Sequence, residues 1–318
     1  MAKPRATLTR VPGLRVGHAE TSGRDRTGVT AVLFDAAAPT VVKILGGATA
    51  TYDTASLDLS ATFGRRWALF FSGGSVFGLD AARGVRTRVL ETGGGHSVFG
   101  NSNRVAPVSG AALFDLPSGP AQLPDYTELG YAAARSATKG AVAHGPVGAG
   151  AGARVGKYLG RARSDPGGVG SAARRLPGVG WVGALAAVNS VGAIRDPSTG
   201  AWVAGARDSR GAFTPPESGE FGRRRSSRER GTTLLIVVTD APLDRPGLER
   251  VASFSATGMA RAVVPTHTAT DGDLVFVAST ATRPLPASRG RAGSLEDRLG
   301  AVAADLIVEA VLSAVAPG

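Results

Sequence analysis

The chain has 318 residues and a formal net charge of +11, and it contains no cysteine. The lack of cysteine excludes disulfide bonds and thiolate metal sites, so hydroxyl groups are the obvious nucleophiles. The length allows one large domain or two ordinary ones, and no apolar run is long enough for a bilayer-spanning helix.

The N-terminal residues and the distribution of charge indicate a soluble cytoplasmic protein. No apolar segment of the signal-peptide type follows residues 1–5. The basic residues are mostly arginines scattered among glycine and alanine, without an aromatic-lined basic motif. We therefore expect neither a membrane nor a nucleic acid as partner. The chain has four histidines without metal-ligand spacing: His18, His96, His144 and His267. No metal or organic cofactor is expected.

Strands and helices interleave along the chain without the regular repeat of a barrel. Short apolar runs between turn residues predict strands over six ranges: 28–34, 41–45, 67–71, 181–191, 234–238 and 274–278. Capping residues and helical apolar spacing predict four helices: after residues 72–75, from Asp125 to near 140, over 248–262, and from Ser294 onward. This alternation predicts a layered α/β or α+β sandwich.

A glycine-rich stretch over 145–157 superficially resembles a phosphate-binding loop because it ends in Gly156-Lys157. The match fails because Ala151 replaces the first required glycine, and Tyr158 replaces the hydroxyl residue that would reach magnesium. The pattern therefore argues against a nucleotide site. Lys157 fits either close packing or a contact with a substrate or an oxyanion.

The junction between Gly231 and Thr232 follows a polar, arginine-rich segment, 207–230, which buries little apolar surface and is predicted to be mobile. A loop that ends at a buried strand explains this pattern. A self-cleavage site explains it as well. Cutting the Gly231–Thr232 bond would give Thr232 a free α-amine, with a pKa of roughly 7.7–8.0, beside its own nucleophilic hydroxyl.

Two carboxylates flank a glycine in Asp271-Gly272-Asp273, directly before a predicted strand. A simple turn accounts for this segment. In a functional interpretation, one carboxylate holds the amine or hydroxyl of the nucleophile and the other shares a proton with it. Mutual repulsion between two carboxylates raises one pKa. A calcium loop would need more oxygen ligands than this segment supplies.

Almost the whole chain resembles the self-processing aminopeptidases of the L-aminopeptidase D-esterase/amidase type, which include β-aminopeptidases and nylon-oligomer hydrolases. No single motif is specific, but their order and combination are. The segments that carry the resemblance are 11–18, 26–30, 110–116, 148–157, Asn189, Gly231-Thr232 and 271–273.

The resemblance implies an α+β fold, a four-layered αββα sandwich similar to N-terminal nucleophile hydrolases. It implies one catalytic domain over 1–318 that cuts itself into an α chain, 1–231, and a β chain, 232–318. It also implies that the αβ units assemble as a homo-oligomer, specifically a tetramer. Many family members resemble one another in having asparagine before the cut, where this chain has Gly231; glycine also occurs there. The implied catalytic residues are Thr232, Asp271, Asp273, Lys157 and Asn189.

The hypothesis is an autoprocessed amide hydrolase that works through an acyl-enzyme on Thr232. In it, Asn189 donates to the oxyanion, Lys157 holds the intermediate or lowers the pKa of the hydroxyl, and Asp271 and Asp273 orient the amine. The alternatives are an acyltransferase resembling ornithine acetyltransferase and a non-catalytic binding protein. The substrate could be an N-terminal L-residue, a D-amide or ester, a β-peptide or a 6-aminohexanoate oligomer. The Thr232 methyl favours an unbranched chain beside the scissile amide, as in 6-aminohexanoate oligomers.

Overall fold

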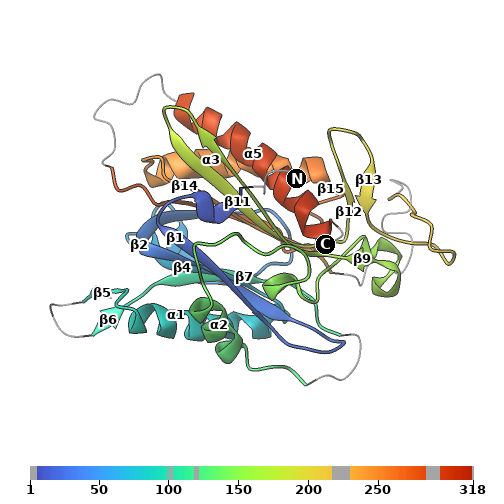
Figure 1. Ribbon diagram of the computed structural model, residues 1–318, viewed down its shortest axis with the longest axis horizontal. Helices are drawn as coiled ribbons and strands as arrows, with labels where there is room; N and C mark the ends of the chain where they lie inside the picture. Colours follow the sequence, from blue (N-terminus) through green and yellow to red (C-terminus); the bar gives the residue numbers. More distant parts are fainter. Residues whose placement is uncertain are drawn as a thin grey trace.

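The computed structural model describes residues 6–98, 100, 103–117, 122–216, 230–283 and 294–316. Its main strands form two stacked layers between helices (Figure 1). The first layer contains β10 (Gly168–Leu176), β11 (Gly180–Asn189), β14 (Thr232–Thr239) and β16 (Leu274–Ser279). The second contains β1 (Leu14–Glu20), β2 (Gly28–Ile44), β3 (Ala50–Tyr52), β4 (Arg65–Ser72) and β7 (Val108–Ala112).

Strand β2 connects the two layers because it runs for 17 residues. Its first half pairs with β1 and β4, and its last residues pair antiparallel with β16, where Ile44 lies opposite Leu274. The sequence predicts two strands here, 28–34 and 41–45. The structure joins them across an irregularity between Leu33 and Ala38: Asp35 N donates to Gly13 O at 2.9 Å, and Ala38 and Pro39 pair with β4.

Helices cover both outer faces of the strand layers (Figure 1). One face carries α1 (Ala81–Glu91) and α2 (Tyr126–Arg135); the other carries α3 (Arg245–Ser255), α4 (Thr257–Ala262) and α5 (Ser294–Val315). Three apolar clusters separate the layers: one between each sheet layer and its helices, and one between the two sheet layers. Three interfaces define four layers, so the predicted α+β sandwich of αββα type is confirmed.

The helix ends follow local chemistry. The Asp125 carboxylate accepts from Thr127 N at 2.8 Å and Glu128 N at 3.2 Å, so the predicted cap of α2 is present. The single helix predicted over 248–262 is instead two, α3 and α4, which meet at Ala256. The predicted terminal helix begins at Ser294 as α5.

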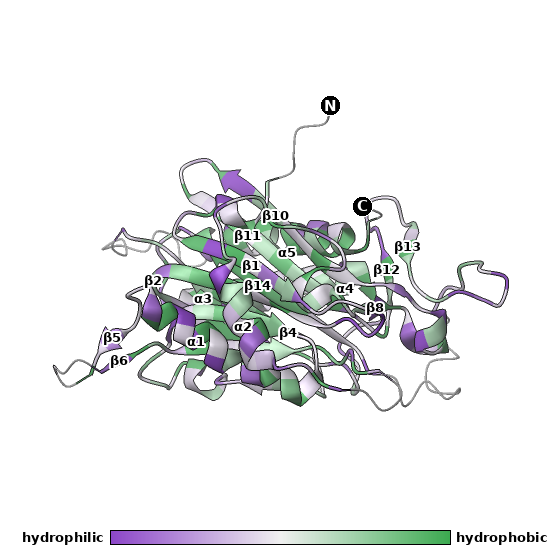
Figure 2. Ribbon diagram, turned by 60° about the horizontal axis from the view of Figure 1, so that its bottom comes forward, coloured by the Kyte–Doolittle hydropathy of each residue, from purple (hydrophilic) through white to green (hydrophobic). Residues whose placement is uncertain are grey.

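Strand β14 lies in the middle of its layer, between antiparallel β11 and parallel β16. All eight of its residues are buried. Its side chains alternate, with Leu234, Ile236 and Val238 facing the second sheet layer and the residues between them facing the helices. Each such apolar side chain contributes roughly 1.5–3 kcal/mol on burial. The strand is therefore firmly held, and so is Thr232 at its start. Figure 2 shows that hydrophobic residues are concentrated in the inner strands and in α5.

The remaining short elements surround the ends of these layers. The short strands are β5 (His96–Ser97), β6 (Arg104–Val105), β8 (Arg154–Val155), β9 (Asp165–Pro166), β12 (Ala193–Arg195), β13 (Trp202–Ala204) and β15 (Val263–Val264). The 3₁₀ turns are η1 (Leu8–Arg10), η2 (Ala55–Leu57), η3 (Ser75–Asp80), η4 (Gly148–Gly150), η5 (Lys157–Leu159) and η6 (Arg161–Arg163).

Most of the segment 207–230 that we predict to be mobile lies outside the described residues, which omit 217–229. Its first part is attached to the body of the protein. Arg207 forms an ion pair with Asp165 at 2.8 Å, and the Phe213 ring stacks on Trp202 with centroids 5.7 Å apart. The start of the segment is therefore held against the body of the protein, contrary to the predicted mobility of these residues, and Thr214 N also donates to Ala206 O at 2.9 Å.

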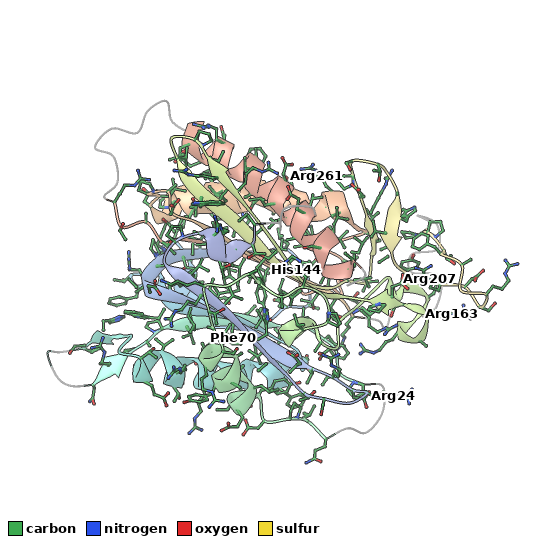
Figure 3. The ribbon with its side chains drawn as sticks, in the orientation of Figure 1. Arg24, Phe70, His144, Arg163, Arg207 and Arg261 are labelled. Carbon is green, nitrogen blue, oxygen red and sulfur yellow. The ribbon has the colours of Figure 1, made fainter. Side chains whose placement is uncertain are left out.

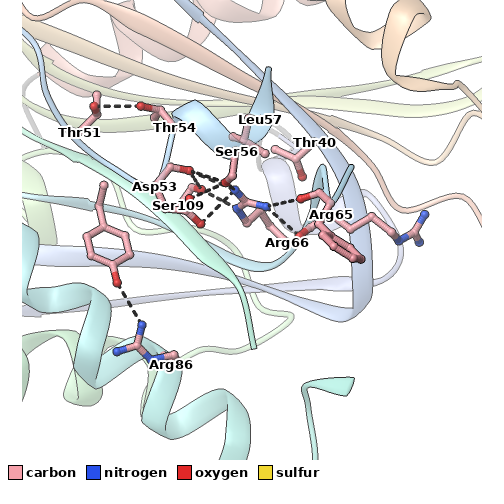
Figure 4. A network of polar contacts seen from close by, with 12 residues as sticks. Thr40, Thr51, Asp53, Thr54, Ser56, Leu57, Arg65, Arg66, Arg86 and Ser109 are labelled. Atoms are coloured by element: carbon pink, nitrogen blue, oxygen red, sulfur yellow. Dashed lines mark hydrogen bonds and ion pairs between the residues drawn. The ribbon is translucent and has the colours of Figure 1, made fainter. Parts of the chain in front are cut away.

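A buried arginine, Arg66 in β4, holds the loop between β3 and β4 (Figure 4). Its guanidinium donates to Ser109 Oγ at 2.6 Å and to the carbonyl oxygens of Phe63 and Asp53 at 3.1 Å, and it also contacts Ser56. An ion pair with the Asp53 carboxylate, also 3.1 Å, balances the charge. Burial lowers the pKa of Arg66, and these partners offset the cost of its desolvation.

The positive charge is spread over the surface. The arginines labelled in Figure 3 lie toward the outside of the fold, with Arg24 on one side, Arg163 and Arg207 together on another, and Arg261 in α4. Some are paired, as Arg261 is with Asp305 at 2.7 Å. In the part of the chain that the structure describes, no helix has the length and apolar character needed to span a bilayer.

Candidate active site

Thr232 is the first residue of β14, and it is only 3% exposed. Its backbone lies opposite Asn189, the last residue of β11. The Thr232 hydroxyl donates a short hydrogen bond, 2.5 Å, to the carbonyl oxygen of Gly231. The hydroxyl therefore contacts the same peptide bond that the sequence analysis predicts to be cut.

The Gly231 carbonyl has a second donor. The main-chain N–H of Gly272 donates to it at 3.0 Å, and the N–H of Gly231 donates to Thr270 O at 3.3 Å. This short parallel bridge continues the pairing of β14 with β16, in which Leu234 lies opposite Leu274. Two donors polarise this carbonyl, which makes its carbon a better electrophile.

The turn at residues 271–273 is held by the segment that directly follows β2. The N–H groups of Leu45 and Gly46 donate to Asp273 O at 2.9 and 3.0 Å, and Ala48 N donates to Asp271 O at 2.9 Å. A Cβ atom on Gly46 would lie 2.2 Å from Asp271 O. The close approach therefore requires glycine at position 46.

Asp273 is fully buried and anchors the start of β14. Its Oδ1 accepts from Thr233 N at 2.6 Å. Its Oδ2 accepts from Thr266 Oγ1 and His267 N, both at 2.8 Å, and lies 3.0 Å from His267 Nδ1. Asp273 thus bonds to the residue after Thr232, and the Thr266–His267 pair fixes the orientation of its carboxylate.

Asp271 is also buried, and it lies against Gly231. Its Oδ2 accepts from Thr268 Oγ1 at 2.6 Å and Thr268 N at 3.1 Å, while its Oδ1 has no hydrogen-bond partner among the described residues. Burial, and then the charge of Asp273, raise the pKa of Asp271. This carboxyl therefore favours its neutral form more than an exposed one does.

Neither carboxylate forms a hydrogen bond with Thr232 itself within the described part of the chain. In the uncut chain the nitrogen of Thr232 is a peptide N–H in the β-ladder with β11. The carboxylates instead flank the junction on both sides, with Asp271 beside Gly231 and Asp273 bonded to Thr233 N.

Lys157 and Asn189 are in contact, although the sequence separates them widely. Lys157 is 1% exposed, and its Nζ donates to Asn189 O at 2.7 Å. The Asn189 side chain is engaged at both ends: its Oδ1 accepts from Arg154 N at 3.0 Å, and its Nδ2 donates to Phe114 O at 2.9 Å. It is therefore the Gly272 N–H, and not the Asn189 amide, that donates to the Gly231 carbonyl oxygen.

The structure thus brings all five predicted site residues to the start of β14. Four contributors lie outside that prediction: the Gly272 N–H, Thr266, His267 and Thr268. The sequence offers a signal for only one of them, because a glycine between two aspartates indicates a tight turn. Among the described residues, no cluster of three or more histidine, aspartate or glutamate side chains is arranged to hold a metal.

This arrangement presents a hydroxyl against a polarised carbonyl, with buried carboxyl and ammonium groups nearby. Known proteins are similar to this chain in sequence and in fold. The model of peptidase family S58 matches residues 6–317. An uncharacterised aminopeptidase of Mycobacterium leprae is 35% identical, with 99% of this chain and 91% of that protein covered. A 6-aminohexanoate-oligomer endohydrolase of Kocuria sp. is 30% identical, with coverage of 95% and 84%.

Solved structures show the same fold. The β-aminopeptidase of Burkholderia sp. superposes with a TM-score of 0.67 at 23% identity, over 99% of this chain and 88% of that one. The L-aminopeptidase D-Ala-esterase/amidase of Ochrobactrum anthropi, described as a variant of the Ntn hydrolase fold, gives 0.65 at 20% identity, over 97% and 85%. The resemblance predicted from the sequence is therefore confirmed: the chain belongs to peptidase family S58 and is a hydrolase of amide or peptide bonds.

Proposed function

We propose that this protein cuts its own Gly231–Thr232 bond and then uses Thr232 as an N-terminal nucleophile to hydrolyse linear amides. The observation that carries the proposal is the geometry of the junction. The Thr232 hydroxyl, 2.5 Å from Gly231 O, and the Gly272 N–H, 3.0 Å from the same oxygen, both bind the carbonyl that the hydroxyl would attack.

Self-cleavage begins when Thr232 Oγ1 attacks the Gly231 carbonyl carbon and loses its proton. The C–N bond then breaks, the Thr232 nitrogen takes up a proton, and an ester joins Gly231 to Oγ1. Water hydrolyses this ester, which frees the Gly231 carboxylate and restores the hydroxyl. The Gly272 N–H stabilises the negative charge on the carbonyl oxygen in both steps.

The new α-amine of Thr232 would then act as general base for its own hydroxyl. Departure of Gly231 would uncover the unpartnered Oδ1 of Asp271, which could receive the amine. Asp273 would keep the strand end in place through Thr233 N. Lys157 would stabilise negative charge near Asn189 O, where its ammonium lies at 2.7 Å.

The α chain, 1–231, and the β chain, 232–318, would remain together after the cut. β11 belongs to the α chain and β14 to the β chain, and they pair antiparallel from Val182↔Thr239 to Asn189↔Thr232. β14 and β16 lie between β11 and β2 in the sheet order. Separating the chains would break the β11–β14 and β16–β2 pairings and expose the apolar core.

For the substrate, we propose 6-aminohexanoate oligomers, with amino-acid anilides as the competing class. The endohydrolases named for those oligomers are 30% identical to this chain, while the relatives named as aminopeptidases reach 35%. The Thr232 methyl narrows the space beside the attacking oxygen and favours an unbranched chain. Assaying both classes at equal concentration decides between them.

We also propose that αβ units assemble as a homo-oligomer. Large apolar side chains remain exposed on the single chain, among them Phe63 (75% exposed), Val76 (60%) and Phe77 (50%). Val76 and Phe77 are neighbours in sequence, and adjacent exposed apolar side chains of this kind often mark contacts between subunits. Native mass measurement of the purified protein gives the number of copies.

The cleavage proposal is tested by a denaturing gel, intact mass and N-terminal sequencing. We expect two chains, and the smaller one should read Thr-Thr-Leu-Leu from residue 232. One uncut chain with full activity, or a different new terminus, would contradict the proposal. Transfer of the acyl group to an added amine in place of water would indicate an acyltransferase, and an intact, inactive chain would indicate a binding protein.

A further inference from the structure

We infer that the active site selects acyl groups whose α-carbon carries no L-side chain and whose far end is cationic. This inference rests on the proposed function. Its basis is that the uncut chain already holds an acyl group beside Thr232: Gly231, extended by Arg230.

Gly231 serves as a model for the acyl group of the substrate, because self-cleavage and substrate hydrolysis form the same kind of ester on Thr232. Self-cleavage forms an ester between the acyl carbon of Gly231 and Thr232 Oγ1, and turnover forms an ester between the acyl carbon of the substrate and the same oxygen. The Gly272 N–H, 3.0 Å from Gly231 O, is the donor available to either carbonyl. The α-carbon of a bound acyl group therefore takes the place of the Gly231 α-carbon.

That place has no room for an L-side chain. A Cβ atom on residue 231 would lie 2.2 Å from Asp271 Oδ1, 2.4 Å from Val191 N and 2.9 Å from Val191 Cγ2. Real Cβ atoms essentially never approach other atoms this closely, and Val191 N is a main-chain atom of a residue only 2% exposed. Even the methyl group of alanine would force the backbone of residue 191 to move.

The next residue along the acyl group meets an aromatic ring. The guanidinium carbon of Arg230 lies 5.4 Å from the centroid of the Phe114 ring, within the range of a cation–π contact. Phe114 is tied to the site, because its carbonyl oxygen accepts from Asn189 Nδ2 at 2.9 Å and Asn189 lies opposite Thr232. The ring thus stands where the far end of an extended acyl group would lie.

Together these contacts define the acyl group that the site accepts. Glycyl amides and linear ω-aminoacyl amides both have a methylene beside the carbonyl, so both avoid the collision at Asp271 and Val191. Amides of other L-α-amino acids carry a Cβ and collide. A positive charge several atoms from the carbonyl adds the contact with Phe114.

The steric part is tested with glycyl-p-nitroanilide and L-alanyl-p-nitroanilide, which differ by one methyl group, on the self-cleaved wild-type protein. We expect kcat/KM to favour glycyl by about 5- to 150-fold, the range for one methyl group forced into a packed site. Val191→Ala removes Cγ2 but leaves Val191 N and Asp271 Oδ1, so the preference should persist in that variant. Loss of the preference there would show that the side chain of Val191 sets it, contrary to our argument.

The possible outcomes separate this inference from the proposed function. Equal or faster turnover of the alanyl substrate by cleaved protein, abolished by Thr232→Ala, would overturn the inference and keep the function. An uncut chain with no turnover of either substrate would overturn the function itself.

The cationic part is tested with L-arginyl-glycyl-p-nitroanilide and L-citrullyl-glycyl-p-nitroanilide, which have the same shape but differ in charge. We expect the arginyl substrate to have a kcat/KM about 2- to 30-fold higher on the wild-type protein. In Phe114→Leu, which keeps the main-chain bond to Asn189, the ratio should fall toward one. Equal values on the wild-type protein, or an unchanged ratio in Phe114→Leu, would refute a role for the ring.

Discussion

The main-chain N–H of Gly272 donates a 3.0 Å hydrogen bond to the carbonyl oxygen of Gly231. Both positions are crowded, and position 231 more so than position 272. A Cβ on Gly272 would lie 2.9 Å from Thr232 Oγ1, and one on Gly231 would lie 2.2 Å from Asp271 Oδ1. The two glycines thus let a carboxylate-rich turn approach the start of a buried strand, and the candidate nucleophile lies between them.

Thr232→Ala should abolish both self-cleavage and hydrolysis, since the same hydroxyl is needed for both. Thr232→Ser keeps a hydroxyl and should retain part of each. Intact mass measured over time, followed by an amide hydrolysis assay, checks both effects. Normal processing in Thr232→Ala would identify another nucleophile.

Removing the Gly272 N–H should slow self-cleavage. Gly272→Pro lacks the N–H, whereas Gly272→Ala keeps it. Both variants place a Cβ near Thr232 Oγ1, so comparing them holds that crowding constant while the donor is removed. We expect Pro to be slower than Ala by on the order of 10²–10³-fold, the usual effect of losing an oxyanion donor. Cleavage is followed by gel, and circular dichroism confirms that each variant is folded. Equal cleavage rates would assign the bond a structural role only.

Asn189→Ala should lower the stability of the uncut chain, because Arg154 N and Phe114 O each lose their partner. Measured in a Thr232→Ala background, the free energy of unfolding should fall by about 1–3 kcal/mol. Urea denaturation gives this value. An unchanged free energy of unfolding, together with a loss of hydrolysis in the cleavable chain, would instead favour the oxyanion role that the sequence suggests for Asn189.

The stability of the uncut chain should depend on pH through Asp271. Burial and the charge of Asp273 raise its pKa above the ordinary value of 3.8. The folded chain then holds this proton more tightly than the unfolded chain does. The contribution is fully present below the ordinary pKa and is lost as the pH rises through the raised value.

The test compares Thr232→Ala with Thr232→Ala/Asp271→Asn by urea denaturation at pH values from below 3.8 to neutral. The free energy of unfolding of the first protein should fall relative to the second as the pH rises across this window. Parallel curves would show that Asp271 does not change its proton affinity on folding.

Local patterns in the sequence were sufficient for the elements whose chemistry is local. Asp125 caps α2 because a carboxylate reaches the N–H groups two and three residues ahead. The apolar run 234–238 forms a buried strand because it has no polar side chain to expose. Two predictions were wrong because local patterns do not contain the contacts that decide them: the single helix over 248–262 and the two separate strands within β2. The break at Ala256 and the single long β2 depend on what packs or pairs against them, as Ala38 does with Arg66.

Local patterns in the sequence pointed to the Gly231–Thr232 junction and to the Asp271–Asp273 pair. The resemblance added Lys157, Asn189 and the four-layered fold. Neither specified the contacts of these residues, since these depend on strand pairing and register. The parallel alignment of Leu234 with Leu274 sets Gly272 N–H against the Gly231 carbonyl. The antiparallel alignment of Asn189 with Thr232 directs the Asn189 amide to Arg154 and Phe114. Burial and capping can be predicted from neighbours in sequence. A hydrogen bond between distant segments is decided only when the sheets assemble, because a shift of one residue in register would send every side chain to the opposite face.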